Sequence, residues 1–234
     1  MGALFSAPTD DEWLAADHEP KRMVIFIEGN ISAGKSTLIN SLKEKKYVVE
    51  EEAVNVWTSQ YVNSEKQNIL ELFYQDKKSN AFEMQLASLV TKWKAIRRVF
   101  ESDEPVILVE RSLLTDINSF ALLMNQQNLL TDIKWSLYCD LHAEFEVQMK
   151  EWMEDIDIHY LYLRTEPEVC FDRVHVRQRS EESNISLDYL QSLHECLDEW
   201  LLCNPTSCID GSQSKEKVLD DVLSYVKEHS RERR

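Results

Sequence analysis

The stretch Gly29-Asn30-Ile31-Ser32-Ala33-Gly34-Lys35-Ser36 decides the fold, because it matches the phosphate-binding pattern G-x-x-x-x-G-K-[ST] without a gap. The apolar run 23–27 before it is typical of a buried strand, and residues 36–45 after it have the pattern of a helix. The chain has only four glycines, and two of them occupy the two glycine positions of the pattern. Backbone N–H groups of such a loop and the start of the helix bind phosphate. The sequence therefore predicts a site for a nucleoside triphosphate.

Charge and composition exclude several other classes of protein. The net charge of -16 argues against general nucleic-acid binding, which needs a basic surface. No apolar run approaches the length of a membrane span, and residues 1–20 are too acidic for a mitochondrial transit peptide. The five cysteines include no C-x-x-C pair, and Cys170 and Cys196 fall in helical patterns where we expect them to fill the core. We expect a cytoplasmic protein with free thiols and with neither a membrane nor a nucleic acid as partner.

Short apolar runs alternate with longer helical patterns along the chain. The runs 23–27, 47–49, 106–109, 160–163 and 208–209 predict strands, and residues 81–100, 112–124, 134–153, 186–203 and 215–229 predict helices. Thr165-Glu166-Pro167-Glu168 has the pattern of a capping box that opens a further helix to about Arg177. This alternation indicates an α/β fold with a five-stranded parallel sheet and helices on both faces. We expect a flexible acidic tail over 1–20 and one domain over 21–234.

Charged residues follow the second and third predicted strands directly. Glu52 ends a run of three carboxylates, and the pair Glu110-Arg111 ends the third strand. In a parallel sheet, ligands bind beyond the carboxyl ends of the strands. A carboxylate there is suited to hold Mg²⁺ and an arginine to bind a substrate oxygen. The alternative is that the carboxylate run is a solvated edge and the pair an ordinary helix-capping charge.

Three arginines lie close together in this strongly acidic chain. Arg173 and Arg177 are one helical turn apart, whereas Arg179 lies on the other side unless the helix ends before it. Arginines that close over a transferring phosphate suit phosphoryl transfer. The alternative is a surface helix whose arginines pair with Glu181 and Glu182.

These motifs in this order resemble the deoxyribonucleoside kinase family. The resemblance covers roughly residues 22–212 and implies a P-loop kinase fold with an arginine-rich lid. The resemblance rests on the segments 27–36 and 52–57, on Glu110-Arg111-Ser112, on the lid 173–182 and on the helix start 183–190. It implies phosphorylation of deoxyribonucleosides by ATP, with Mg²⁺, in a homodimer. Trp93, Phe100, Leu122 and Leu123 are candidates for the dimer interface, and the alternative is that they belong to the core.

The resemblance also implies a role for individual residues. Glu52 is similar to the general base and Arg111 to its partner at the sugar 5′-hydroxyl, and Lys35 completes the catalytic set. Ser36 and Glu110 are similar to the Mg²⁺ site. The residues expected to bind ATP are Gly29, Asn30, Ile31, Ser32, Ala33, Gly34, Lys35, Ser36, Thr37, Arg173, Arg177, Arg179 and Asp210. The residues expected to bind the nucleoside are Glu52, Trp57, Tyr74, Gln85, Lys92, Arg111, Asp116, Phe120 and Glu182, with Ile31 also lining the base pocket.

The pair Lys92 and Asp116 bears on which nucleobase the substrate carries. Lys92 is two helical turns past Gln85, so both face the same side of their helix. Family members that prefer deoxycytidine or purines have an arginine and an aspartate where this chain has Lys92 and Asp116. We therefore expect deoxycytidine or a purine deoxynucleoside to be preferred over thymidine, unless Lys92 is an ordinary exposed lysine.

Two other functions remain open at this point. A nucleoside monophosphate kinase of the thymidylate kinase type shares the phosphate loop, but Glu52 and Glu182 would repel its phosphorylated acceptor. A nucleotide-dependent switch without kinase activity is the second, although the chain has no N-K-x-D run typical of a GTP switch.

Overall fold

The computed structural model describes residues 22–153, 156–182 and 184–231. The acidic tail expected over 1–20 lies outside the described residues. Five parallel strands form one sheet in the order β2-β3-β1-β4-β5. Their bounds are β1 Arg22–Glu28, β2 Val48–Glu50, β3 Val106–Glu110, β4 Ile156–Arg164 and β5 Ser207–Asp210. The α/β fold with a five-stranded parallel sheet is thus as the sequence predicts.

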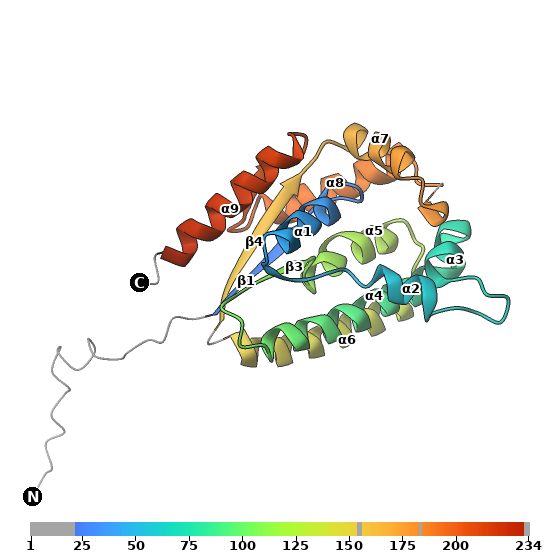
Figure 1. Cartoon of the computed structure of the whole chain (residues 1–234). Helices are drawn as coiled ribbons and strands as arrows, with labels where there is room; N and C mark the ends of the chain where they lie inside the picture. Colours follow the sequence, from blue (N-terminus) through green and yellow to red (C-terminus); the bar gives the residue numbers. More distant parts are fainter. Residues whose placement is uncertain (1–21, 154–155, 183, 232–234) are drawn as a thin grey trace, which may run out of the picture.

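Helices cover both faces of the sheet (Figure 1). Outside the lid region, those that correspond to helices predicted from the sequence are α1 Lys35–Glu44, α4 Lys77–Phe100, α5 Ala121–Gln126, α6 Asp132–Met153, α8 Leu187–Leu201 and α9 Lys215–Arg231. Two short helices, α2 Val54–Ser59 and α3 Ile69–Gln75, were not expected from the sequence. The lid is α7 Pro167–Arg177 followed by the 3-10 turn η2 Ser180–Glu182.

The alternation of side chains along β1 builds two cores. Met23, Ile25 and Ile27 pack toward α1 and α9, whereas Val24 and Phe26 pack toward α4 and α6. Because β1 lies in the middle of the sheet, both of its faces are buried, which explains why its sequence is continuously apolar. This rigid centre holds the loop that follows β1.

The aromatic residues considered for a dimer interface are mostly in the core. Trp93 stacks on Phe145 and on Trp152, with ring centroids 4.7 and 5.3 Å apart. Phe100 and Leu123 are also buried, and Leu122 is half-buried. Cys170 and Cys196 are buried as well, as expected of core residues.

The capping box expected at Thr165 is wrong. Helix α7 does begin with Pro167, but Glu166 is its N-cap and no side chain caps it. The Thr165 hydroxyl instead donates to the backbone carbonyl of Ala33 at 3.0 Å. Thr165 therefore ties the end of β4 to the phosphate loop.

A π-helical turn, η1 Asp116–Phe120, interrupts the helix expected over 112–124. Such turns are rare and often mark functional sites. Here the turn begins at Asp116 and ends at Phe120, two of the residues expected to bind the nucleoside. No helix in the described part of the chain combines the length and the apolar character that crossing a membrane requires.

Candidate active site

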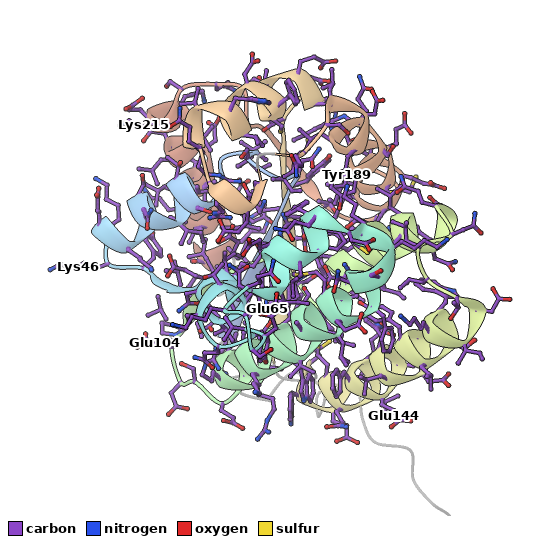
Figure 2. All side chains as sticks on the ribbon, turned by 90° about the vertical axis from the view of Figure 1, so that its right-hand side faces the viewer. Lys46, Glu65, Glu104, Glu144, Tyr189 and Lys215 are labelled. Carbon is purple, nitrogen blue, oxygen red and sulfur yellow. The ribbon has the colours of Figure 1, made fainter. Side chains whose placement is uncertain are left out.

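A cavity of about 1060 Å³ opens at the carboxyl end of the sheet. Figure 2 looks onto this end of the molecule, where α3 and the lid lie. The expected site residues that line the cavity are Ile31, Ser32, Ala33, Gly34, Lys35, Ser36, Thr37, Glu52, Trp57, Tyr74, Gln85, Glu110, Arg111, Asp116, Phe120, Arg173, Arg177, Arg179 and Glu182. They come from segments that are far apart in the sequence. The volume is at the upper end of the range for small-molecule sites and is large enough for two small ligands side by side.

The phosphate loop takes the strained shape that its glycines permit. Gly29 has φ 154° and Gly34 φ 113°, both outside the range that other residues favour. A Cβ at Gly29 would lie 2.8 Å from the carbonyl oxygen of Leu163, so β4 leaves no room for a side chain. The loop therefore needs glycine here for two reasons, its backbone conformation and this close approach.

Lys35 is buried at the start of α1. Its Nζ donates to the carbonyls of Gly29 and Asn30, at 3.0 and 2.8 Å. Burial, and then the nearby charge of Arg111, lower the pKa of Lys35 to about 8, although Glu110 and Glu52 act in the opposite direction. A buried ammonium in this position is suited to bind an anionic ligand.

Glu52 and Arg111 form an ion pair in the cavity. Arg111 Nε lies 3.0 Å from Glu52 Oε1. Burial alone would raise the pKa of the Glu52 carboxyl, but Arg111, Lys92, Lys35 and Arg179 hold it below its usual value. Glu52 is thus ionised at neutral pH and is able to accept a proton.

A buried carboxylate that the sequence analysis did not single out fixes the position of Arg111. Glu28 accepts hydrogen bonds from the backbone N–H of Ser112 at 2.8 Å and from the Thr115 hydroxyl. These bonds hold the turn in which Arg111 has φ 67°, a left-handed conformation that is uncommon for arginine. Glu28 is the last residue of β1, directly before the phosphate-loop motif, and no sequence signal marks its contact with the turn at Arg111.

The Ser36 hydroxyl donates to Glu110 Oε1 at 3.2 Å at the edge of the cavity. A hydroxyl and a carboxylate are hard oxygen ligands of the kind that Mg²⁺ takes, usually together with waters and substrate phosphates. Among the described residues no group of three or more His, Cys, Asp or Glu side chains is arranged to hold a metal by itself. The pair therefore fits a Mg²⁺ ion that arrives with a nucleotide.

The three lid arginines all line the cavity. Helix α7 ends at Arg177, and Gln178 takes a left-handed conformation that turns the chain, so Arg179 is free to point to the same side as Arg173. Arg173 donates to the carbonyls of Ala33 and Gly211, at 2.9 Å each. Arg177 and Arg179 both pair with Glu182, the latter at 2.6 Å. The pairing expected of a surface helix is thus present, but inside the cavity.

A second buried ion pair lies at the other end of the cavity. Lys92 Nζ is 2.7 Å from Asp116 Oδ1, and the Ser88 hydroxyl donates to Asp116 Oδ2 at 2.6 Å. The lysine and aspartate side chains are only 6% and 3% exposed, so Lys92 is not an ordinary surface lysine. Gln85 lies on the same helix, and its Oε1 is buried without a hydrogen-bond partner. A ligand with a donor group would satisfy this oxygen.

Four of the expected residues do not line the cavity. Gly29 and Asn30 begin the phosphate loop, and their carbonyls accept hydrogen bonds from Lys35, whereas Lys92 pairs with Asp116, which lines the cavity. Asp210 is exposed and accepts a bond from the backbone of Ser212, and its neighbour Gly211 lines the cavity instead. The sequence analysis missed Ser88 and Tyr189, which also line it. Both lie in ordinary helical patterns that give no signal of a site.

Comparison with known proteins gives one consistent result. A sequence model of the family described as deoxynucleoside kinase matches residues 25–231. A fowlpox virus protein named "probable deoxycytidine kinase" is 31% identical over 219 residues, which cover 87% of this chain and 88% of the viral protein. Human deoxycytidine kinase is 31% identical over 196 residues, 76% of this chain and 75% of the human enzyme. The bovine deoxycytidine kinase is 31% identical over 207 residues, 80% of this chain and 79% of its own length.

Proposed function

The chain belongs to the deoxynucleoside kinase family, and from this premise we propose how its residues perform the reaction. The enzyme transfers a phosphoryl group from ATP to a deoxynucleoside. The observation that carries our proposal is the ion pair between Glu52 and Arg111, 3.0 Å apart, in the same cavity as the phosphate loop. In the proposal Glu52 takes the proton from the sugar 5′-hydroxyl, and Arg111 orients the carboxylate and the hydroxyl.

The donor side of the cavity supplies positive charge. The backbone of residues 31–37 and Lys35 hold the phosphates, and Arg173, Arg177 and Arg179 close over the group in transfer. Charge builds on the phosphoryl oxygens during transfer, so pre-positioned cations lower the barrier. Binding of ATP requires Arg177 and Arg179 to exchange part of their contact with Glu182 for contact with phosphate. Gly211, rather than Asp210, borders the donor in this proposal.

Ser36 and Glu110 hold Mg²⁺ in this proposal. When bound, the ion neutralises phosphate charge and orients the donor. Glu110 also accepts a hydrogen bond from the backbone N–H of Glu52 at 3.5 Å. The same carboxylate thus links the metal site to the segment that carries the base.

The acceptor side of the cavity suits an uncharged nucleoside. Tyr74 and Glu182 bind the sugar 3′-hydroxyl, and Gln85 reads the edge of the base. Ile31, Trp57 and Phe120 line the base pocket. A nucleoside monophosphate would bring its phosphate toward Glu52 and Glu182, which disfavours a monophosphate kinase.

We propose that deoxycytidine or a purine deoxynucleoside is preferred over thymidine. The buried pair of Lys92 and Asp116 places charge beside Gln85, where a base with an exocyclic amino group gains more than thymine. The relatives named deoxycytidine kinases support this preference. A purified-protein assay with ATP and each of the four deoxynucleosides, alongside their monophosphates, tests it. Thymidine as the best acceptor would contradict the preference, and phosphorylation of monophosphates alone would contradict the acceptor class.

We also propose that the protein is a cytoplasmic homodimer. The interface residues considered from the sequence lie mostly in the core, but α6 presents the apolar side chains Ile133, Leu137 and Val147 to solvent. Ile133 and Leu137 lie one turn apart on the same side of the helix, whereas the exposed carboxylates of Asp140 and Glu144 separate them from Val147. The patch of Ile133 and Leu137 is the part of α6 that a second copy would cover.

A further inference from the structure

Tyr189 lines the cavity, and its buried hydroxyl has no hydrogen-bond partner among the described residues. The residue is only 5% exposed. Leaving a buried hydroxyl unpaired is costly and rare in folded proteins. A ligand that reaches the hydroxyl removes this cost when it binds.

The position of Tyr189 points to the sugar rather than to the phosphates. It lies in the first turn of α8, where Ser186 caps the helix by accepting from the backbone N–H of Tyr189 at 3.2 Å. It packs in one cluster with Ile31, Tyr74 and Phe120 on the acceptor side. Burial raises the pKa of the Tyr189 phenol, so the hydroxyl keeps its proton at neutral pH and both donates and accepts. Tyr189 is labelled on the cavity end of the molecule in Figure 2.

A lysine lies over the ring of Tyr189. Lys77 Nζ lies 3.5 Å from the centre of the Tyr189 ring, and 5.8 and 5.9 Å from the rings of Tyr74 and Phe73. No carboxylate among the described residues pairs with this ammonium, and burial lowers its pKa. It also stands at the first position of α4, where the helix dipole disfavours a cation. Contact with aromatic faces is therefore the interaction that compensates for its position.

Lys77 connects two walls of the cavity that come from distant parts of the chain. Helix α4 carries Gln85 and Lys92, whereas α8 follows the lid directly. Lys77 does not line the cavity itself. Any effect that it has on the ligand must therefore pass through the rings of Tyr189 and Tyr74.

We propose that Tyr189 contacts the sugar of the bound deoxynucleoside through its hydroxyl, and that Lys77 is a positioning residue that fixes the Tyr189 ring. This inference rests on the proposed placement of the acceptor in the cavity. It adds a sugar contact to those of Glu52, Arg111, Tyr74 and Glu182, and a cation that acts through an aromatic ring.

The test compares Tyr189→Phe with the wild type in two measurements. The variant keeps the ring, and with it the packing and the contact with Lys77, but loses the hydroxyl. We expect the calorimetric Kd for deoxycytidine and its KM to rise about five- to tenfold, while kcat and the KM for ATP stay within about twofold, as loss of one ground-state hydrogen bond predicts. Tyr160→Phe is the matched control, because Tyr160 is a half-buried tyrosine in β4 that does not line the cavity.

Variants of Lys77 distinguish a role in positioning the Tyr189 ring from a general effect on folding. Lys77→Met is expected to raise the deoxycytidine Kd about two- to fivefold, and Lys77→Arg to restore it, because a guanidinium also stacks on the ring. In the Tyr189→Phe background Lys77→Met should add less loss than it does in the wild type, since only the more distant contact with the Tyr74 ring remains. Lys78→Met, the exposed neighbour on the same helix, carries the same change of charge and should bind as the wild type.

Comparing two nucleosides that have the same sugar but different bases distinguishes a sugar contact from a base contact. The Tyr189→Phe loss should be the same for deoxycytidine and deoxyadenosine. A loss confined to one base, a loss that falls on ATP, or unchanged binding of both nucleosides would overturn the inference. A wild type that phosphorylates no deoxynucleoside would contradict the proposed function instead, and calorimetry without ATP would still decide the contact.

Discussion

Residue scale: the charge of the Glu52 carboxyl depends on the cations around it. Arg111 itself is buried, and burial alone would lower its pKa, but Glu52, Glu28, Glu110 and Asp116 together raise it. The guanidinium is therefore permanently charged and keeps Glu52 ionised. A base that is ionised at every physiological pH accepts a proton without first losing one.

Replacing Glu52 with glutamine is expected to lower kcat by about 10²–10⁴-fold, because the amide keeps the shape but cannot accept the proton. The KM for the nucleoside should change much less. Steady-state kinetics on deoxycytidine measure both. Glu51→Gln is the control, since the Glu51 carboxylate pairs with Lys43 at 2.6 Å and not with Arg111. Retention of full turnover in Glu52→Gln would remove Glu52 from the role of base.

The lowered pKa of Lys35 predicts how kcat/KM for ATP changes at alkaline pH. With its pKa lowered to about 8, the ammonium is charged below pH 8 and neutral above it in the ligand-free enzyme. The value of kcat/KM for ATP, which reports the free enzyme, is expected to fall about tenfold per pH unit above 8. At saturating ATP the bound phosphates raise the pKa of Lys35, so kcat should hold to higher pH. A kcat/KM profile that stays flat to about pH 9.5 would contradict this assignment.

Element scale: the loop after β5 meets the phosphate loop at Gly211. A Cβ on Gly211 would lie 2.0 Å from Thr165 Oγ1 and 3.1 Å from the carbonyl oxygen of Ala33. The Gly211 carbonyl also accepts a hydrogen bond from the Arg173 guanidinium at 2.9 Å. The end of β4, the phosphate loop and the lid thus all contact one residue without a side chain.

Gly211→Ala is expected to raise the KM for ATP at least about tenfold and to lower the free energy of unfolding by about 1–3 kcal/mol, because the loop must move away from Thr165. Kinetics and urea denaturation measure the two effects. Ser212→Ala, at the exposed neighbouring position, should change neither. An unchanged KM for ATP in Gly211→Ala would mean that this loop does not border the donor.

The central strands β1 and β3 could be predicted from the sequence because both of their faces are apolar and buried. The first half of β4 was missed, since Asp157 and His159 break its apolar run. His159 Nδ1 lies 2.8 Å from the Tyr225 hydroxyl of α9, a distant partner that no local pattern reveals. The capping box failed for the same reason, because the carbonyl of Ala33 competes for the Thr165 hydroxyl.

The strand-tip residues of the candidate site were predictable because parallel strands end at one edge of the sheet. Glu52, Glu110 and Arg111 follow this rule. Tyr189 does not, since it belongs to an amphipathic helix whose buried face is partly the wall of a cavity. The sequence marks that face as apolar but does not distinguish a core from a ligand site.

Whole-molecule scale: the exposed apolar patch of Ile133 and Leu137 on α6 bears on the oligomeric state. Ile133 and Leu137 are 75% and 56% exposed, which is unusual for side chains of this size on one helix face. In a homodimer they would be covered.

Ile133→Glu together with Leu137→Glu is expected to convert a dimer into a monomer, because the paired copies would each bury two new charges. Light scattering coupled to gel filtration measures the mass of the wild type and the variant. Lys134→Glu, on the same helix, is the control for the added charge. A wild type that elutes with the mass of one chain would contradict the dimer.

The depth of the Lys92–Asp116 pair has a consequence for how the enzyme responds to electrolyte. Counter-ions reach exposed charges readily but hardly affect a pair that is 6% and 3% exposed, whereas Arg177 and Arg179 are each 32% exposed. Raising KCl from about 0.02 to 0.5 M should therefore change the KM for ATP, which the lid arginines bind. The order of preference among the four deoxynucleosides should stay the same. Discrimination between nucleosides would then be constant across the ionic strengths that the protein meets, while the concentration of ATP that it needs would vary.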